Sequence, residues 1–395
     1  MNVHIYPAPF MEQTRVFKIT RSLVESGIFP RIVIYGVGGG EEAGAQKLDA
    51  RRDLYLISRS LDNKKSSLLF KVANTIEWSY KIIQNIRGRK VTCINCHSLA
   101  VLPLCVYLKK KTHATLIYDT HELETETDGV GGIRKALMKI AERGLIKYAD
   151  AVSVVSDSIA DWYRQEYGLS EVTVVRNIPY KVSVDFRKKP YFRNYFSIPP
   201  QHTIFLYQGL ISFQRGVQLL LKVFSQLEPS KHLVFMGAGD ALDTVLAYAD
   251  QHENIHYHPA GPPDENIHYH PAVPPAELPQ YTCGADVGVH LIEDTCLNHR
   301  YCLPNKIWEY LSVGLPVVVS DLPEMAKVVQ ELNCGWTVRP DEKSAVELFQ
   351  QLTAAEIASG KANVMRRGNL FSWEKEEKQL LAMYHGLGYL KATIC

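Results

Sequence analysis

The segment at residues 298–321, NHRYCLPNKIWEYLSVGLPVVVSD, constrains the fold more than any other stretch of the chain. Pro304 suits the start of a helix, because proline lacks the N–H that a first helical turn leaves unbonded. Gly314 suits the end of that helix, since glycine readily takes the left-handed conformation found there. The run of three valines at residues 317–319 is typical of a parallel strand covered on both faces. The segment therefore predicts a loop, a short helix, a turn and a buried strand.

The predicted helix carries its polar side chains on one side. Ile307, Tyr310 and Leu311 have the spacing i, i+3 and i+4, so we expect them to pack inward. Lys306 and Glu309 then lie one turn apart on another face. Lys306 and the unbonded N–H groups of the first turn would favour a bound phosphate. An exposed Lys–Glu pair that contributes little to stability is the alternative, and the spacing alone does not decide between the two.

The block LPNKIWEYLSVGLPVVVSD, at residues 303–321, resembles the signature of the retaining GT-B glycosyltransferases of family four, often called group 1. The resemblance implies an α/β fold of two Rossmann-like domains facing across a cleft, with a C-terminal helix that crosses back to the first domain. It also implies that Glu309 binds the donor ribose and that Pro304, Asn305 and Lys306 lie at the diphosphate. Tyr301 takes the place of a glutamate that many members carry there, and we include it among the donor-binding residues.

Length and charge set broad limits on function. The 395 residues, of which 46% are hydrophobic, suit two domains that each bury a core. Lys and Arg number 44 and Asp and Glu 42, and this near-balance argues against a nucleic-acid partner. No apolar run approaches the roughly 20 residues of a membrane span, and the first residues do not resemble a signal peptide. We therefore expect a cytoplasmic protein.

Three small basic clusters, at residues 64–65, 87–90 and 109–111, are the sequence features that could contact an anionic membrane. Such runs are more often solvated faces, so peripheral contact with the inner membrane is an open expectation. The motif Cys93-Ile94-Asn95-Cys96-His97 has the spacing of a c-type haem site, but it lies in a segment typical of a buried strand. We expect no haem, metal or other cofactor.

Short apolar runs alternate with helix-length amphipathic stretches in the first half, as in a doubly wound parallel sheet. The predicted strands are residues 3–6, 31–35, 54–57, 91–96, 115–119, 151–155 and 172–175, and the predicted helices are residues 17–25 and 67–86. The glycines at residues 36–40 lack the Lys-Ser/Thr of a phosphate-binding loop, and we interpret them and the acidic stretch that follows as a surface loop.

His121 follows a predicted strand, in the sequence YDTHE, and the carboxyl ends of parallel strands face the ligand crevice. A histidine at such a place is more often structural. The sequence YDTHE, however, resembles the family motif whose imidazole lies between the donor sugar and the acceptor. The resemblance therefore implies a catalytic role for His121.

A second alternating series predicts strands at residues 203–208, 233–236, 287–292 and 335–338, and helices at residues 217–227 and 345–352. Between the first of these strands and its helix, Gly209 and Arg215 resemble the family loop in which two cations clamp the diphosphate. Arg215 matches the later cation, whereas Leu210 stands where the earlier one is expected. The segment from about Ser372 resembles the closing helix of the family.

Residues 253–264 and 265–276 are a near-perfect tandem duplicate. Each copy contains His-x-His, which on a strand places both rings on one face. We expect one copy to form a strand of the second domain and the other to form a loop.

These observations predict a first domain at residues 1–180 together with residues 374–395, a linker at 181–200, and a nucleotide-sugar-binding domain at 201–373. The resemblance implies a retaining transfer of sugar from a nucleotide diphosphate sugar to a hydroxyl of a sugar or lipid-linked glycan, without a metal, in bacterial surface polysaccharide or glycolipid synthesis. His121, Arg215 and Lys306 are the residues to which it assigns the reaction. A nucleotide-sugar epimerase of the same fold and a non-catalytic glycosyltransferase-like subunit are the alternatives.

Overall fold

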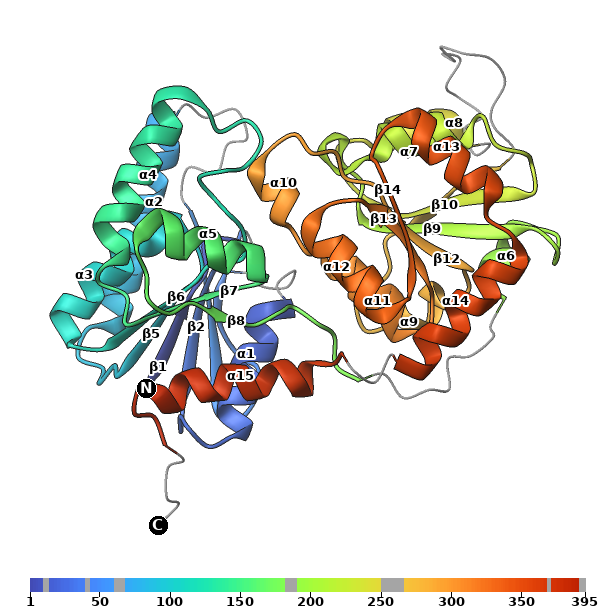
Figure 1. Ribbon diagram of the computed structural model, residues 1–395. Coiled ribbons are helices and arrows are strands. Elements are labelled where there is room, and N and C mark those ends of the chain that lie inside the picture. The colour runs from blue at the N-terminus through green and yellow to red at the C-terminus, as the bar shows by residue number, and fades with distance from the viewer. Residues whose placement is uncertain are drawn as a thin grey trace. The chain divides into compact units, whose positions relative to one another are not determined.

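The computed structural model describes residues 1–9, 14–39, 43–59, 68–181, 190–249, 266–367 and 371–390. The chain forms two compact units, drawn in Figure 1: unit 1 is Met1–Asn177 with Lys375–Cys395, and unit 2 is Ile178–Glu374. Each unit has its own parallel-rich sheet with helices on both faces, so the two Rossmann-like folds predicted from the sequence are confirmed.

Unit 1 is built on one eight-stranded sheet in the order β3-β4-β2-β1-β5-β6-β7-β8. The strands are β1 (Asn2–Ile5), β2 (Ile32–Val37), β3 (Gly44–Lys47), β4 (Arg52–Ile57), β5 (Cys93–Cys96), β6 (Thr115–Asp119), β7 (Ala151–Val154) and β8 (Thr173–Val174). All neighbours pair in parallel except β3 and β4. The central strands are fully buried, which explains why they appear in the sequence as continuous apolar runs.

The strand β3 differs from the expectation. We interpreted the acidic stretch after the glycine cluster as a surface loop, but Gly44–Lys47 pairs antiparallel with β4. All four of its residues are exposed, so the segment has no apolar alternation that could have revealed an edge strand. The other strands that we predicted in unit 1 are present, with ends shifted by one or two residues.

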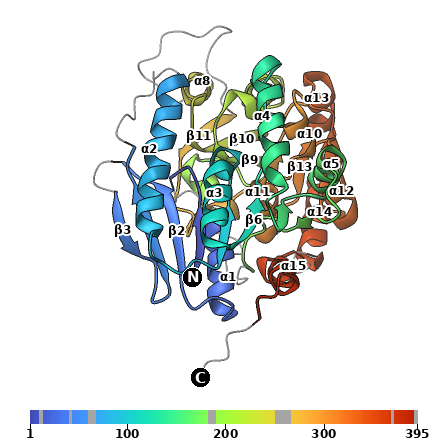
Figure 2. The same ribbon diagram turned by 90° about the vertical axis from the view of Figure 1, so that its left-hand side faces the viewer.

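The helices of unit 1 are α1 (Thr14–Glu25), α2 (Leu68–Ile86), α3 (Leu102–Thr112), α4 (Gly132–Ile146), α5 (Asp157–Tyr167) and most of α15 (Trp373–Gly386). Right-handed crossovers place α2, α3 and α4 on one face of the sheet, and Figures 1 and 2 show these three helices next to one another. The last helix, α15, returns to unit 1 as predicted. There Tyr384 donates a hydrogen bond from its hydroxyl to Asn95 Oδ1 at 2.6 Å.

Unit 2 contains a six-stranded, wholly parallel sheet in the order β11-β10-β9-β12-β13-β14. The strands are β9 (Thr203–Leu210), β10 (Lys231–Ala238), β11 (Ile267–Pro271), β12 (Val287–His290), β13 (Val317–Ser320) and β14 (Gly335–Val338). The helices are α6 (Tyr191–Tyr195), α7 (Val217–Phe224), α8 (Leu242–Tyr248), α9 (Leu278–Thr282), α10 (Leu297–Tyr301), α11 (Asn305–Ser312), α12 (Pro323–Leu332), α13 (Glu342–Gln351) and α14 (Ala354–Arg367).

The segment at residues 298–321 forms the predicted short helix, turn and buried strand. Pro304 precedes α11, Gly314 follows it with φ +86°, and β13 is fully buried. Ile307, Tyr310 and Leu311 all pack into the core of unit 2. The neighbouring strand makes room for this packing at Gly288, because a Cβ there would lie 2.2 Å from the ring of Tyr310.

The end of the predicted linker belongs to the core of unit 2. Residues 182–189 lie outside the described residues, but α6 follows them, and Phe192 and Ile198 are buried in the core. The second copy of the duplicate supplies β11, and its His268 and His270 both contact aromatic rings of α6 or the residue after it, so the two rings share one face. The first copy lies outside the described residues.

Candidate functional site

Polar side chains gather at the carboxyl ends of the strands in each unit. In unit 1 they form the histidine cluster, which consists of His4, Arg15, His97, Asp119 and His121. In unit 2 they form the cationic cluster, which consists of Gln208, Arg215, His290, Lys306 and Glu309. Crevices at the carboxyl ends of parallel strands are the usual ligand sites of such sheets. We describe each cluster within its own unit.

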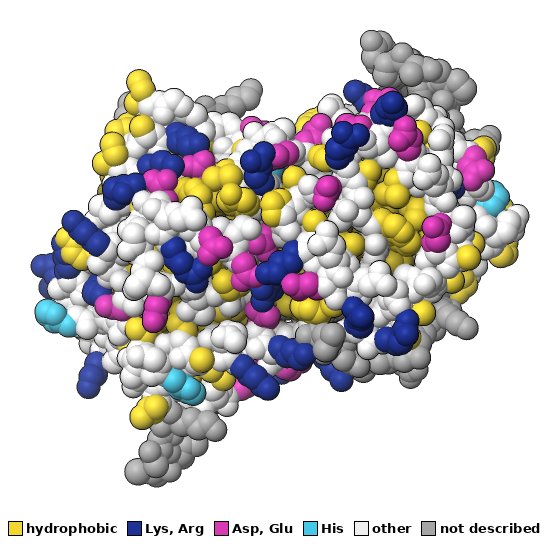
Figure 3. All heavy atoms as spheres, viewed as in Figure 1, with side chains coloured by type: hydrophobic (Ala, Val, Ile, Leu, Met, Phe, Trp, Pro, Cys, Tyr) yellow, Lys and Arg dark blue, Asp and Glu magenta, His cyan; other side chains and the backbone are white. Residues whose placement is uncertain are grey.

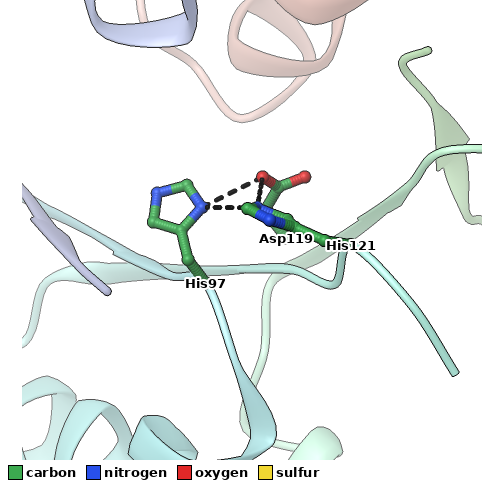
Figure 4. A group of neighbouring side chains, drawn as sticks. All are labelled: His97, Asp119 and His121. Atoms are coloured by element: carbon green, nitrogen blue, oxygen red, sulfur yellow. Dashed lines mark hydrogen bonds and ion pairs between the residues drawn. The ribbon is translucent and has the colours of Figure 1, made fainter. Parts of the chain in front are cut away.

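Three side chains of the histidine cluster converge on one point, as Figure 4 shows. His97 directly follows β5, Asp119 ends β6 and His121 comes two residues later. Asp119 Oδ2 lies 3.0 Å from His97 Nδ1 and 3.2 Å from His121 Nε2. The two ring nitrogens are 3.3 Å apart. His97 is buried, whereas the side chain of His121 is about one-fifth exposed, so His121 is the member that a ligand can reach.

Asp119 is the anchor of this cluster. Arg15, from α1, donates to both carboxylate oxygens, with Nε at 3.1 Å from Oδ2 and a terminal nitrogen at 2.6 Å from Oδ1. Ser153 of β7 donates a further hydrogen bond at 2.6 Å. Burial alone would raise the pKa of Asp119, but the Arg15 charge and the hydrogen bonds from the two histidines hold this pKa well below its usual value. The carboxylate is therefore ionised at neutral pH.

His4 lies behind His97 and fixes its tautomer. His4 Nδ1 is 2.8 Å from His97 Nε2, and no residue that the structure describes forms a hydrogen bond with His4 Nε2. Burial lowers the pKa of both rings, so they are neutral. A proton on His4 Nε2 would leave a buried donor unsatisfied, whereas a proton on Nδ1 can be donated to His97. His97 then carries its own proton on Nδ1 and donates it to Asp119.

The ligand atoms of His97, Asp119 and His121 lie within 4.8 Å of one another, which is close enough to share a metal ion. Arg15 already neutralises Asp119, however, and its Nε contacts the same Oδ2 that a metal would use. A cation would have to compete with this buried guanidinium and also remove the proton from His97. The residues present therefore fit an anchored imidazole at His121 better than they fit a metal ion.

The cationic cluster is centred on Lys306, in the first turn of α11. Its side chain is buried, with only 7% of the residue exposed, and its ammonium lies 3.8 Å from the centre of the Tyr207 ring. Among the described residues, none forms a hydrogen bond with Lys306 Nζ. Burial, together with the nearby Arg215 charge, lowers the pKa of Lys306 to about 7. The alternative of an exposed Lys–Glu pair is therefore wrong for Lys306.

Glu309, one turn further along α11, is held at the end of β9. It accepts a hydrogen bond from Gln208 Nε2 at 2.7 Å. Gln208 is itself buried, and its Oε1 accepts a hydrogen bond from Thr282 at 2.8 Å. Sequence reasoning did not single out Gln208, although a polar residue that ends the apolar run at residues 204–207 was a detectable signal.

Two further side chains face the same region of unit 2. Arg215 lies in the turn between β9 and α7, and its charge contributes to lowering the pKa of both Lys306 and His290. His290 ends β12 and is fully buried, and neither of its ring nitrogens has a hydrogen-bond partner within the described ranges. Its pKa lies well below the usual value, first because of burial and then because of Lys306 and Arg215. His290, like Gln208, was not identified as a candidate site residue from the sequence.

The remaining predicted donor residues lie close to these two turns. A Cβ at Gly209 would be 3.9 Å from Lys306 Cε, and the positive φ of +100° at this glycine lets the chain leave β9 beside the lysine. Tyr301 ends α10, while Pro304 and Asn305 begin α11. Leu210, at the position of the missing family cation, is 52% exposed. All of the predicted donor residues belong to unit 2, whereas His121 lies in unit 1.

The cationic cluster is suited to an anion. A buried ammonium without an acceptor costs free energy, and that cost would be recovered by a ligand that supplies negative oxygens. Arg215 can offer a second cation, and the first turn of α11 offers backbone N–H groups. A diphosphate carries the negative charge and the oxygens that groups of these kinds bind.

Two protein-family models match the chain. Residues 13–178 match the model described as Glycosyltransferase Family 4, and residues 202–354 match the model described as Glycosyl transferases group 1. A search of the curated proteins gave no match. No helix among the described residues is long and apolar enough to cross a membrane.

Several solved structures share the fold over nearly the whole chain. Sucrose-phosphate synthase from Thermosynechococcus elongatus has a TM-score of 0.78 at 13% identity, with 98% of each chain covered. HepE from Anabaena, solved in complex with UDP, has a TM-score of 0.70 at 13% identity and covers 98% of this chain and 100% of its own. WaaG, a glycosyltransferase involved in lipopolysaccharide biosynthesis, has a TM-score of 0.65 at 13% identity, with 96% and 99% covered.

Proposed function

Because the chain belongs to the family 4, group 1 glycosyltransferases of the GT-B fold, we propose that it moves a sugar from a nucleotide diphosphate sugar to an acceptor hydroxyl with retention of configuration. In this reaction the bond from the anomeric carbon to the diphosphate breaks and a bond to the acceptor oxygen forms on the same face. The acceptor proton passes to the departing phosphate oxygen, so no external acid or base is consumed.

The buried ammonium of Lys306 is the observation that carries the proposal. It lies near the Arg215 charge at the start of α11, and no acceptor in the described part of the chain satisfies it. The leaving diphosphate gains charge as the sugar departs, so fixed cations in a water-poor site stabilise the transition state more than the ground state. With Lys306 and Arg215 in this role, we propose that no metal ion is required. Glu309, held by Gln208, is assigned to the ribose hydroxyls.

His121 is assigned to the sugar and acceptor side of the reaction. Its Nε2 is fixed by Asp119, and its ring stacks on Tyr6 at 5.6 Å between centres. An imidazole that is held in this way has one defined orientation, which is what substrate positioning requires. His97 and Arg15 act through Asp119 and are positioning residues in this proposal.

The acceptor that we propose is a sugar or a lipid-linked glycan, in bacterial surface polysaccharide or glycolipid synthesis at the cytoplasmic face of the membrane. The support is the family and the structural relatives, which include a glycosyltransferase involved in lipopolysaccharide biosynthesis and a protein solved with UDP-glucose. We propose no nucleic-acid partner.

The direct test is to incubate the protein with a panel of nucleotide sugars, a panel of sugar and lipid-linked glycan acceptors, and EDTA, and to measure released nucleoside diphosphate. We expect one sugar nucleotide to be turned over in EDTA, and NMR of the glycoside product to show the donor's anomeric configuration. His121→Ala should lower kcat more than it weakens donor binding. Turnover that requires added divalent metal would overturn the metal-free part.

The same panel separates the two alternatives. A donor that is isomerised without any acceptor would indicate an epimerase of this fold. Tight nucleotide binding without turnover of any donor would indicate a non-catalytic subunit, since fold alone does not establish activity.

A further inference from the structure

The helix α4 carries its apolar side chains on the outside. Ile133, Leu137 and Ile140 are 80%, 61% and 68% exposed, and their spacing of i, i+4 and i+7 places them in one stripe along the helix. Ala136 and Gly144, which flank the stripe, are exposed as well. A surface helix of a globular protein normally turns such a stripe toward the core. In α4 the arrangement is reversed.

The rotation of α4 is fixed by buried polar contacts on its inner side. Glu142 is fully buried, and its Oε1 accepts hydrogen bonds from the hydroxyls of Tyr118 at 2.8 Å and Tyr163 at 2.7 Å. Its Oε2 accepts a third hydrogen bond, from Tyr167, at 2.6 Å. Turning the stripe inward would move this carboxylate out and leave buried phenols without their acceptor. The outward stripe is therefore built into the fold of unit 1.

Cations border the stripe. Arg134 on α4 and Lys147 directly after it are exposed, and the adjacent end of α3 carries Lys110 and Lys111. The ammonium groups of Lys110 and Lys147 both lie over the ring of Tyr148, at 4.3 and 5.6 Å from its centre, which joins the ends of the two helices. Figure 3 shows yellow and dark blue side chains next to one another over the part of unit 1 where Figure 1 draws α4.

Other cations of α4 are already paired. Lys135 and Lys139 contact Glu126, and Arg143 contacts Glu166. The positive charge that remains available comes from Arg134, Lys147 and the α3 lysines. An aliphatic stripe flanked by lysine and arginine is the pattern of a helix that lies in the interface of a membrane.

We propose that the outer face of α4, with the basic end of α3, docks on the surface of an anionic lipid bilayer. The aliphatic side chains would enter the headgroup region, and the bordering cations would contact lipid phosphates. A second copy of this chain is the competing occupant, but a two-fold contact through α4 would bring these like charges together. The proposal rests on the proposed function at one point only: docking on a bilayer would hold unit 1 close to a lipid-linked acceptor.

The test is co-sedimentation of the full-length protein with vesicles of phosphatidylcholine alone and with added phosphatidylglycerol. We expect binding to the anionic vesicles, and a loss of at least about tenfold in the double variant Leu137→Glu/Ile140→Glu. The variant Leu137→Lys/Ile140→Lys should retain part of the binding, since it loses the apolar contact but keeps the sign of charge. Met365→Glu, at an exposed apolar residue of α14 in unit 2, is the matched control and should bind like the unaltered protein.

Binding that is absent, or equal in the glutamate variant and the control, would overturn the proposal. So would a concentration-dependent dimer in analytical ultracentrifugation that the glutamate variant abolishes while no vesicles are bound. All variants should keep their nucleotide affinity and melting temperature, because the substituted side chains are exposed and lie outside both clusters. Vesicle binding is measured without any sugar nucleotide, so failure of the proposed transferase activity would leave this result unaffected.

Discussion

At the scale of single residues, we expect binding of an anionic ligand near Lys306 to be coupled to protonation of its side chain. Its pKa in the unligated protein is about 7, and a bound diphosphate would raise that pKa by supplying the missing negative charge. Above pH 7 the protein must therefore take up a proton when it binds the ligand. We predict that the dissociation constant of a nucleoside diphosphate rises by up to about tenfold per pH unit between pH 7 and 9.

Calorimetry in two buffers of different ionisation enthalpy at pH 8 measures this proton uptake. The control is Lys306→Met, which should bind weakly with no proton uptake. It should also be more stable at pH 7 by about 1–3 kcal/mol, because it removes an unsatisfied buried donor. In the unaltered protein the unfolded state holds the lysine proton more tightly, so stability should increase as pH rises from about 7 toward 10.5. A pH-independent dissociation constant would contradict the buried, unpaired ammonium.

The sequence was enough to predict which residues of α11 pack inward and which belong to the candidate site. It was not enough to predict the burial and the contacts of those site residues. The spacing separated Ile307, Tyr310 and Leu311 from the polar face, and the family motif indicated Lys306 and Glu309. The burial of Lys306 depends on the Tyr207 ring, which comes from a strand about a hundred residues earlier. Arg15 and Asp119 are likewise 104 residues apart, and no local pattern joins them.

At the scale of elements, β12 and α11 pack closely because Gly288 has no side chain. Gly288 lies under Tyr310, whose hydroxyl accepts a hydrogen bond from the backbone N–H of Gln208 at 3.0 Å. We predict that Gly288→Ala costs about 1–3 kcal/mol of stability, because the new methyl group would displace the ring. Thermal unfolding measures this cost. Gly144→Ala is the matched control, since that helical glycine has open space around it and should become slightly more stable.

An unchanged melting temperature in Gly288→Ala would show that α11 can shift without penalty, and Lys306 and Glu309 would then not be held in fixed positions. Donor affinity should fall together with stability in this variant. That coupling is expected because the same helix carries the ring of Tyr310 and the two polar side chains.

The tandem duplicate gives a second prediction for an element. Its second copy supplies β11, which pairs with β10 over residues 267–271. Deletion of residues 253–264 should therefore leave folding and nucleotide binding largely unchanged, since the remaining copy forms the strand. Circular dichroism melting and nucleotide titration of the deletion variant measure both properties. A collapse of the melting temperature would show that both copies are needed by unit 2.

The outward-facing aliphatic stripe of α4 explains why this helix was not predicted from the sequence. Periodicity identifies a helix by an apolar face that is assumed to point inward, and α4 points its aliphatic stripe outward while Glu142 is buried. The three phenols around Glu142 come from β6 and α5, so only the folded unit reveals which side of the helix is inside.

At the scale of the whole molecule, the chain is two α/β units that each complete their own sheet, and the fold class was predictable from alternation along the sequence. The strongest local signals lay in unit 2, where strands and helices alternate in a regular order and the family motif covers α11 and β13. The histidine cluster of unit 1 draws on four separate segments, and for that reason only His121 was identified from the sequence.

We propose above all that α11 of unit 2 binds the nucleotide of the donor. The most direct test is the affinity of the tightest-binding nucleoside diphosphate for the full-length protein and for Glu309→Ala, measured by isothermal titration calorimetry. Each charge-assisted hydrogen bond to the ribose contributes about 1.5–3 kcal/mol, so we predict a loss of about tenfold or more. Tyr301→Phe, which keeps the ring, should lose much less affinity and should melt like the unaltered protein. Glu309→Ala should melt somewhat lower, because the buried Gln208 Nε2 loses its acceptor. An affinity that is unchanged in Glu309→Ala would contradict the assignment of α11 as the donor site.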